Sequence, residues 1–501
     1  MDRYDRIYNL YENFSTDTLR DRQNFIDLFP PVDSRVALEY WEDAHDELQA
    51  QKHEIRDAFS NEQYTETDSE DFYEHDTSVD QTSDSRTSLE TTEDGTLAPE
   101  TMAAIASRAT REQAFTALDL SMKYQRKVNA LVLDVDETLR SAGGTDNEIP
   151  RETLHHLTEI HENDIPIIIC TGQTLENVKG FAIQGLGSEL VHSGDISIVY
   201  EAGTGVFTPG HGSDTKRLLY AELDSEIQSI FTHVRSQVLP EAPEKIQQSA
   251  HLQGNEFNIT LKPNHETGSD AAETVIDDGL CYLIDLLGGV VTEAVDIDDE
   301  TVASIQDNMT ADVDISSVSD GASDDDVDSG TRTTQTETEA DNIGALWARA
   351  YYASADPEIA TVLEEADVAP PMDSDSIPTP VRTRFDRIDV AYYHADAAEI
   401  GSLDLDKPTG VQAAFDVLGI SDPFALIMGD SKSDLRIMEW AQTHDAGIAA
   451  APRHASTRVL EHVRTTDDLV FEPGDAASIL RTISVLNHLD PTKPASEQRH
   501  G

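Results

Sequence analysis

The chain has 501 residues, and 38% of them are hydrophobic, which is enough to build a substantial buried core. Its 97 acidic residues outnumber its 35 basic residues, so that the formal net charge is −62. A surface of that charge repels nucleic acid and anionic membranes, and we expect neither as a partner. Because the excess extends into segments with helical patterning, it also favours a cytoplasm with very high salt, where repulsion between carboxylates is screened.

Cys170 and Cys281 are the two cysteines of the sequence, which excludes a fold held together by a disulfide framework. The sequence starts without the sustained hydrophobic stretch of a signal peptide. No later hydrophobic run approaches the roughly 20 residues that a membrane-spanning helix needs. We therefore expect a soluble cytoplasmic protein.

The first 126 residues are predicted to be helical, with one acidic interruption. Hydrophobic residues recur at helical spacing in residues 1–59, whereas Ser, Thr, Asp and Glu dominate residues 60–99. The second segment has too few hydrophobic residues to offset the entropy lost on folding, and it is predicted to be a disordered linker. Residues 100–126 are predicted to be a helical lead-in to the next domain.

Short hydrophobic runs alternate with helical patterns in residues 127–204 and 386–490. Continuous hydrophobic runs joined by helices predict an α/β core, with a Rossmann-like, doubly wound parallel sheet covered on both faces. The intervening residues 205–385 are predicted to be an inserted α+β cap domain. Within them, the acidic tract 296–341 is predicted to be a disordered insertion, and residues 491–501 are a tail.

Two carboxylates follow the first hydrophobic run of the predicted core. Asp134 and Asp136 stand at the carboxyl end of this run, where ligands bind in open parallel sheets. About one residue in five of this chain is acidic, so that chance pairs of aspartates are frequent. Taken alone, the pair is better explained as a solvated turn after a strand.

Two further positions suit the binding of phosphate. Thr171 and Gly172 follow a predicted strand and precede a helix, where a hydroxyl and backbone N–H groups can bind an anion. Lys407 precedes another helical segment. Taken separately, the threonine is better explained as a helix N-cap and the lysine as a surface charge.

Asp430 and Asp434 form a second acidic pair, after the predicted strand at residues 424–428. A carboxylate at the end of a strand and another one helical turn later can face one point, and Mg²⁺ prefers such oxygen ligands. A capped helix start explains this pair as well. The order of the groups favours a site, because acidic pair, hydroxyl, lysine and acidic pair follow one another, three of them at the ends of hydrophobic runs.

In this order, the four segments resemble the motifs of the haloacid dehalogenase-like phosphatase superfamily. LDVDETL (133–139) is similar to the first motif, ICTGQT (169–174) to the second, Lys407 to the third and GDSKSDLRIM (429–438) to the fourth. The long interval before Lys407 resembles members whose cap is inserted there, including Cof-type sugar phosphatases and sucrose-phosphate or mannosyl-phosphoglycerate phosphatases. The acidic composition favours a member from a halophilic archaeon.

The resemblance implies a role for each motif. Asp134 is expected to be the nucleophile that forms an aspartyl-phosphate, and Asp136 the general acid and base. The expected phosphate-binding groups are Thr171, Gly172 and Lys407. The expected cofactor is Mg²⁺, with Asp134, Asp136 (through its main-chain carbonyl), Asp430 and Asp434 at the metal site.

Two departures from the family leave the substrate open. Many relatives have Arg where this chain has Gln173, and Asn where it has Ser433. The favoured function is a phosphatase acting on a small phosphorylated metabolite, a sugar or polyol phosphate. The alternatives are a phosphotransferase with the same intermediate and a non-catalytic phosphosugar-binding regulatory protein. Candidate substrate contacts in the cap are Lys216, Arg217, Asn258 and Lys262, although such residues are more often surface groups.

Overall fold

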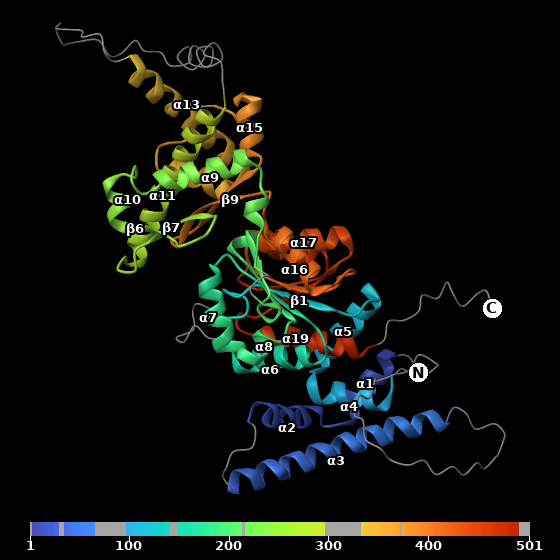
Figure 1. Cartoon of the computed structure of the whole chain (residues 1–501). Coiled ribbons are helices and arrows are strands. Elements are labelled where there is room, and N and C mark those ends of the chain that lie inside the picture. The colour runs from blue at the N-terminus through green and yellow to red at the C-terminus, as the bar shows by residue number, and fades with distance from the viewer. Residues whose placement is uncertain are drawn as a thin grey trace, which may run out of the picture.

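The computed structural model describes residues 3–29, 35–65, 97–140, 149–212, 216–295, 332–370 and 372–489. They form three parts that follow one another across the view of Figure 1. N-terminal helices lie at the bottom, an α/β core lies in the middle, and an α+β part lies at the top (Figure 1). Among the described helices, none combines the length and the hydrophobicity needed to cross a membrane.

The core is built on an eight-stranded sheet with the order β12-β11-β10-β1-β2-β3-β4-β5. The strands from β12 to β3 are parallel, and β4 and β5 continue the sheet in antiparallel pairing. All residues of β1, β2, β3 and β10 are buried, because helices cover both faces. The predicted doubly wound parallel sheet is thereby confirmed. The strands are β1 (Ala130–Leu133), β2 (Ile167–Cys170), β3 (Ile196–Tyr200), β4 (Gly205–Phe207), β5 (Arg217–Leu218), β10 (Ala425–Met428), β11 (Gly447–Pro452) and β12 (Leu469–Phe471).

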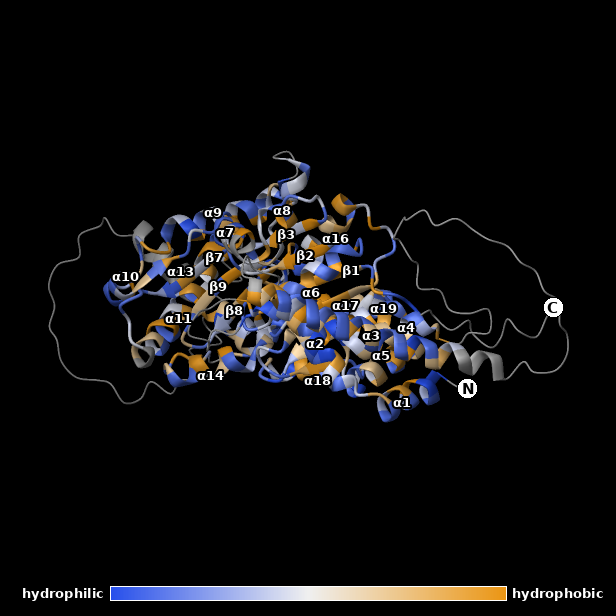
Figure 2. Ribbon diagram, turned by 90° about the horizontal axis from the view of Figure 1, so that it is seen from below, coloured by the Kyte–Doolittle hydropathy of each residue, from blue (hydrophilic) through white to orange (hydrophobic). Residues whose placement is uncertain are grey.

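Different helices cover the two faces of this sheet. Alternate side chains of β1 belong to separate hydrophobic clusters, Leu131 and Leu133 to one and Ala130 and Val132 to the other. In Figure 2 the hydrophobic colour of β1, β2 and β3 contrasts with the mixed colours of the helices around them. The first face packs against α5 (Arg111–Tyr124), α6 (Arg151–Glu162), α7 (Leu175–Leu186), α8 (Ser188–Val191) and α19 (Ala476–His488), and the second against α16 (Lys407–Leu418), α17 (Lys432–His444) and α18 (Thr457–Thr465).

The N-terminal helices extend the first of these two hydrophobic clusters. They are α1 (Arg3–Asn13), α2 (Thr16–Leu28), α3 (Arg35–Thr65) and α4 (Pro99–Arg108). A capping box between Thr110 and Gln113 then starts α5. Because α3 continues to Thr65 and α4 begins at Pro99, helix occupies both margins of the predicted linker 60–99, whose residues 66–96 lie outside the described residues.

The third part has a four-stranded antiparallel sheet of its own, with the order β6-β7-β9-β8. Its helices share one hydrophobic cluster with alternate residues of this sheet. Two glycines, Gly288 and Gly344, let α11 and α13 approach, since a Cβ on Gly288 would lie 2.2 Å from the Gly344 carbonyl oxygen. The elements are α9 (Ser225–Gln237), α10 (Glu244–Ser249), β6 (Ala250–Leu252), β7 (Ile259–Pro263), α11 (Ser269–Ala294), α13 (Arg332–Ala355), α14 (Pro357–Glu365), α15 (Thr379–Phe385), β8 (Ile388–Tyr393) and β9 (Ala397–Ser402).

The strand pairing places the boundaries of this cap later than the predicted range 205–385. β4 and β5 extend the core sheet, whereas β8 and β9 pair with β7. The sequence does not indicate which of the two sheets these four strands join, because a short strand buries its hydrophobic side chains equally well in either sheet. The predicted disordered tract 296–341 ends in helix, since α13 begins at Arg332; residues 296–331 and the predicted tail lie outside the described residues.

Candidate active site

The carboxyl ends of three neighbouring strands carry the predicted catalytic groups. β1 lies between β10 and β2 in the sheet, so that Asp134, Asp430 and Thr171 follow adjacent parallel strands. Lys407 opens α16, whose first turn is fixed by Asp406, which accepts a hydrogen bond from the Thr409 N–H. The parallel topology therefore brings together groups that are up to about 300 residues apart in the sequence.

Lys407 is the cation at the centre of these groups. Its Nζ donates to Asp134 Oδ1 at 3.0 Å and to Asp434 Oδ1 at 2.6 Å, and all three side chains are buried. Burial lowers the pKa of the lysine, but the two carboxylates outweigh it and raise that pKa well above its usual value. Lys407 is therefore held in its charged form, which suits a group that binds an anion.

Negative charge exceeds positive charge at this point. Carboxylate oxygens of Asp134, Asp430 and Asp434 lie within 4.8 Å of one another, beside the single cation of Lys407. Burial, and then the neighbouring carboxylates, raise the pKa of Asp134 well above its usual value and that of Asp430 to about 7. The surplus of two negative charges and the set of oxygen donors fit a divalent cation such as Mg²⁺.

Asp434 organises the loop between β10 and α17. Its Oδ2 accepts hydrogen bonds from the N–H groups of Asp430 and Ser431 and from the Ser431 hydroxyl, while its Oδ1 accepts from Lys407. Gly429 permits this turn, because a Cβ there would lie 2.3 Å from that of Asp434. With both oxygens in use, Asp434 orients its neighbours, and Asp134 and Asp430 are the more open ligands for a metal ion.

Asp136 lies at the edge of the cluster, and its side chain is 46% exposed. Its Oδ1 accepts from Arg140 Nε at 2.9 Å and Nη2 at 2.6 Å, and its Oδ2 accepts from Gln173 Nε2 at 2.5 Å. The following residue, Glu137, has a left-handed backbone with φ of 57°, which turns the chain away from the strand. Arg140 was not among the predicted site residues, although its spacing of four residues from Asp136 indicates such a pair.

The second motif forms a turn beside Asp134. The buried Thr171 hydroxyl accepts a hydrogen bond from the Gln173 N–H at 3.1 Å. A Cβ on Gly172 would have no heavy atom within 4 Å, so this turn borders open space. Thr171 and Gly172 thus lie where an anion can approach the ends of β1 and β2.

The four candidate contacts in the cap lie in different places. Lys216 pairs with Glu256 at 2.5 Å, and Asn258 is buried at the junction of core and cap. Lys262 pairs with Asp396 at 3.2 Å on the cap sheet, and Arg217 belongs to β5 of the core sheet. Lys216 and Arg217 thus lie at the edge of the core sheet, whereas Asn258 and Lys262 belong to the cap, and among the described contacts none of the four pairs with Asp134, Asp430 or Asp434.

Residues of the cap sheet that face away from the cap's own hydrophobic cluster lie toward α16 and α17. Arg436 of α17 donates to Asp389 of β8 at 2.6 Å, and Lys432 of α17 pairs with Asp356. Tyr393 of β8 keeps 38% of its surface accessible, yet desolvation of its hydroxyl raises its pKa, with Lys407 among the charges that act on it. The open face of the cap sheet, which the cap's own helices do not cover, therefore borders the predicted catalytic groups.

No protein-family model matches the sequence, and no curated protein matches it. Solved structures match the chain at low sequence identity and low TM-score. A trehalose-6-phosphate phosphatase from Aspergillus fumigatus is 13% identical with a TM-score of 0.35, covering 75% of this chain and 97% of its own. A haloacid dehalogenase-like hydrolase from Bacteroides thetaiotaomicron has 13% identity and a TM-score of 0.35, with 72% and 99% covered. A sugar phosphatase of haloacid dehalogenase subclass IIB has 15% identity and a TM-score of 0.35, with 72% and 100% covered.

Proposed function

We propose that this chain is a magnesium-dependent phosphatase that hydrolyses a small phosphate monoester through an aspartyl-phosphate on Asp134. The observation that carries the proposal is the buried Asp134 carboxylate, held 3.0 Å from Lys407 Nζ at the carboxyl end of the central strand. Asp136 follows it by two residues, and the turn of Thr171 and Gly172 lies on the neighbouring strand. Nucleophile, proton carrier and anion-binding groups thus share one edge of the sheet.

The first step is an attack of an Asp134 oxygen on phosphorus. The bond between phosphorus and the ester oxygen breaks, and the leaving oxygen takes a proton from Asp136. Lys407, the Thr171 hydroxyl and the N–H groups of this turn would offset the negative charge of the phosphoryl oxygens. Two anions can approach each other only where positive charge is concentrated in this way.

The second step is hydrolysis of the aspartyl-phosphate. Asp136, now a carboxylate, takes a proton from water, whose oxygen attacks phosphorus and releases phosphate and free Asp134. Arg140 binds one carboxylate oxygen of Asp136 and Gln173 binds the other. In each step, one of these two oxygens must turn toward the substrate or the water. Arg140 and Gln173 therefore set the position from which the proton is delivered.

Mg²⁺ bound by Asp134, the main-chain carbonyl of Asp136 and Asp430 would neutralise charge on the phosphoryl group. Without a cation, burial and mutual repulsion raise the pKa of Asp134 and Asp430, which opposes the ionised form that a nucleophile needs. Lys407 supplies one of the compensating charges. Asp434 keeps Lys407 in place through its 2.6 Å contact.

The groups on the open face of the cap sheet favour a hydroxyl-rich leaving group. Tyr393 supplies a hydroxyl and Glu399 a carboxylate there, Glu399 accepting from the buried Thr260 hydroxyl, and Lys262 is paired with Asp396. Donors and acceptors of this kind suit the hydroxyls of a sugar or polyol, while the carboxylates disfavour a leaving group with acidic substituents. A sugar or polyol phosphate is therefore the proposed substrate class.

A turnover screen of sugar and polyol phosphates with Mg²⁺ in molar KCl tests the proposal, with para-nitrophenyl phosphate as a generic ester. We expect steady release of phosphate from the wild-type protein and none from Asp134→Asn. Transfer of the phosphoryl group to an added alcohol in place of release would favour a phosphotransferase. Tight binding of a sugar phosphate without turnover would favour a regulatory binding protein.

A further inference from the structure

A short segment after β3 joins three parts of the site. It consists of Glu201, Ala202 and Gly203, whose backbones are left-handed with φ of 47°, 54° and 107°. Left-handed backbone is unfavourable for residues other than glycine, so two such residues in succession need compensation from their surroundings. The contacts of this segment provide that compensation.

The first contact joins the segment to the phosphate-binding turn. The N–H of Glu201 donates to the Gln173 carbonyl at 2.9 Å, and the N–H of Ala202 donates to the Thr171 carbonyl at 3.0 Å. The segment therefore holds the backbone on both sides of Gly172. A displacement of Glu201 would be passed directly to the turn that is proposed to bind phosphate.

The second contact joins the segment to the helix that carries Lys407. A Cβ on Gly203 would lie 2.0 Å from the Asp406 carbonyl oxygen and 2.9 Å from the Lys407 nitrogen. A Cβ on Gly410, in the same helix, would lie 2.9 Å from the Gly203 Cα. The two glycines thus allow the segment and the start of α16 to pack backbone against backbone.

The third contact joins the segment to the cap through the carboxylate of Glu201, which is fully buried. Oε1 accepts from the Glu256 N–H at 2.6 Å and Oε2 accepts from the Phe257 N–H at 3.0 Å. Asn258 Nδ2 also donates to the Glu201 carbonyl at 3.1 Å. A carboxylate of the core thereby satisfies consecutive backbone groups of a cap loop.

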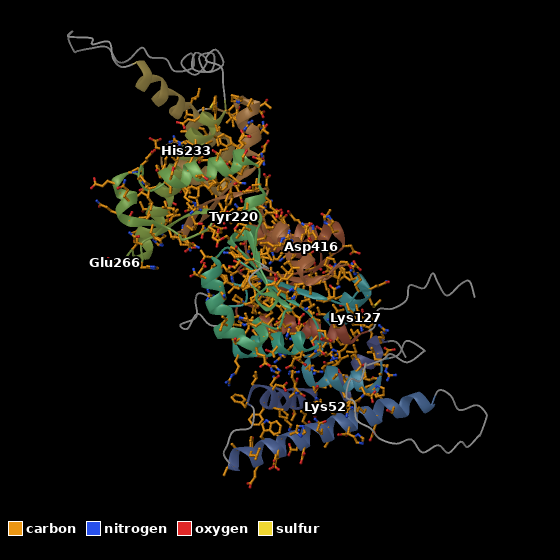
Figure 3. The ribbon with its side chains drawn as sticks, viewed as in Figure 1. Lys52, Lys127, Tyr220, His233, Glu266 and Asp416 are labelled. Atoms are coloured by element: carbon orange, nitrogen blue, oxygen red, sulfur yellow. The ribbon has the colours of Figure 1, made fainter. Side chains whose placement is uncertain are left out.

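The cap holds the same loop from its other side. Arg235 of α9 donates to the carbonyl of Asn255 at 3.1 Å and to the carbonyls of Phe257 and Asn258 at 2.6 Å each. The Phe257 ring stacks on Tyr220, which lies where core and cap meet (Figure 3). Residues 255–258 are therefore fixed to the cap by Arg235 and to the core by Glu201.

We propose that Glu201 is a positioning residue that couples the seating of the cap to the phosphate-binding turn and to Lys407. The segment 201–203 is in direct contact with all three, so that movement of the cap loop and movement of the turn are linked through one carboxylate. By linkage, phosphate bound at the turn tightens the hold on the cap loop, and a loosened cap loop weakens phosphate binding. This second statement rests on the proposed function.

Amide hydrogen exchange resolved at Glu256 and Phe257 tests the coupling without turnover. In Glu201→Gln, one N–H must face an NH₂ group, and loss of the charged acceptor should speed exchange of these amides roughly ten- to a hundredfold. Asp224→Asn is the matched control, because Asp224 also accepts two successive backbone N–H groups, of Glu226 and Ile227, but within the cap. Exchange at Glu256 and Phe257 should not change in this control.

The same measurement with MgCl₂ and inorganic phosphate tests the linkage. In the wild-type protein and in Asp224→Asn, phosphate should slow exchange at Glu256 and Phe257, and in Glu201→Gln it should not. Glu201→Asp, which keeps the charge on a shorter side chain, should be intermediate and guards against misfolding of the glutamine variant.

Two results would overturn the coupling. One is unchanged exchange of the two amides in a folded Glu201→Gln variant, and the other is equal slowing by phosphate in that variant and the wild type. Absence of any phosphate binding to the wild-type protein by calorimetry would instead contradict the proposed phosphatase, while the exchange rates without phosphate still decide whether Glu201 holds the cap loop.

Discussion

Among the described residues, two clusters have side chains placed closely enough to hold a metal ion, and their electrostatics are opposite. One is the group of Asp134, Asp430 and Asp434 at the carboxyl end of the sheet, and the other is His155, His156 and Glu159 on α6. The first holds three carboxylates against one lysine. In the second, the single carboxylate is met by Arg108 at 2.6 Å and by His156 at 3.4 Å.

The pKa values of the carboxyl groups are shifted in opposite directions in the two clusters. In the first cluster burial and repulsion raise the pKa of Asp430 to about 7. In the second, burial acts upward on Glu159, but His156 and Arg108 outweigh it and lower its pKa to about 2. Arg481 Nε donates to His156 Nε2 at 2.8 Å, which places the proton of a neutral imidazole on Nδ1, facing Glu159. That ring therefore has no lone pair for a metal ion.

An excess of one charge, and not the proximity of ligand types, separates the two clusters. The α6 cluster joins the N-terminal helices to the core, since Arg481 also binds Asn24 and His155 lies 3.5 Å from Asp27. Its charges are matched, as expected of a structural contact. The surplus at Asp134 and Asp430 is unfavourable for folding alone and makes sense as a site for a cation.

The largest expected effect is on turnover. Asp134→Asn keeps the shape of the side chain and removes the attacking charge, so that phosphate release should fall by at least about a thousandfold in a protein with an unchanged circular-dichroism spectrum. The matched variant Glu159→Gln, in the balanced cluster, should retain turnover. A folded Asp134→Asn protein with a tenth of the wild-type rate would remove Asp134 as the nucleophile.

The next effect is on the response to Mg²⁺. Asp430→Asn should weaken the stabilisation of the protein by MgCl₂ in thermal melts, with at least about a tenfold loss of apparent affinity. Without Mg²⁺ the same variant should melt no lower than the wild type, because it removes one of the surplus buried charges. Glu159→Gln should leave the Mg²⁺ response unaltered, and equal Mg²⁺ responses of Asp430→Asn and the wild type would contradict the assigned ligand.

Much of this arrangement could be predicted from the sequence, because hydrophobic runs specify buried strands and parallel strands bring their carboxyl ends together. That reasoning leads to Asp134, Thr171 and Asp430. It could not reach Glu201, whose partners are backbone groups of a loop in the cap, or Arg235, whose partners are carbonyls of the same loop. Contacts of this kind depend on how two folded parts pack against each other, which the periodicity of hydrophobic residues along the chain does not predict.

A smaller effect is expected on stability at the balanced cluster. Glu159 has a lowered pKa, so its contribution is fully present above the unfolded value near 4.5 and is lost as the pH falls toward about 2. Glu159→Gln should therefore lower the free energy of unfolding by about 1–3 kcal/mol at pH 7, and the difference should shrink at pH 3. Glu162→Gln, at an exposed position on the same helix, is the control and should change little. A difference that does not depend on pH would mean that the charge of Glu159 is not what stabilises the contact.

The smallest expected effect has the opposite sign and concerns Glu399, on the open face of the cap sheet. Burial raises its pKa to about 7, and the hydrogen bond from the Thr260 hydroxyl at 2.6 Å only partly opposes this shift. A carboxyl group with a raised pKa binds its proton more tightly in the folded protein, so folding is favoured at low pH and loses stability as the pH rises from about 4.5 to about 7. Glu399→Gln, which stays neutral, should then be more stable than the wild type by at least about 1 kcal/mol at pH 8, and the difference should be clearly smaller at pH 5. Glu266→Gln, at an exposed position of the cap labelled in Figure 3, is the control and should show no such trend. If Glu399→Gln were the less stable protein at pH 8, Glu399 would be compensated as Glu159 is, and it would belong with the structural carboxylates and not with those that face a substrate.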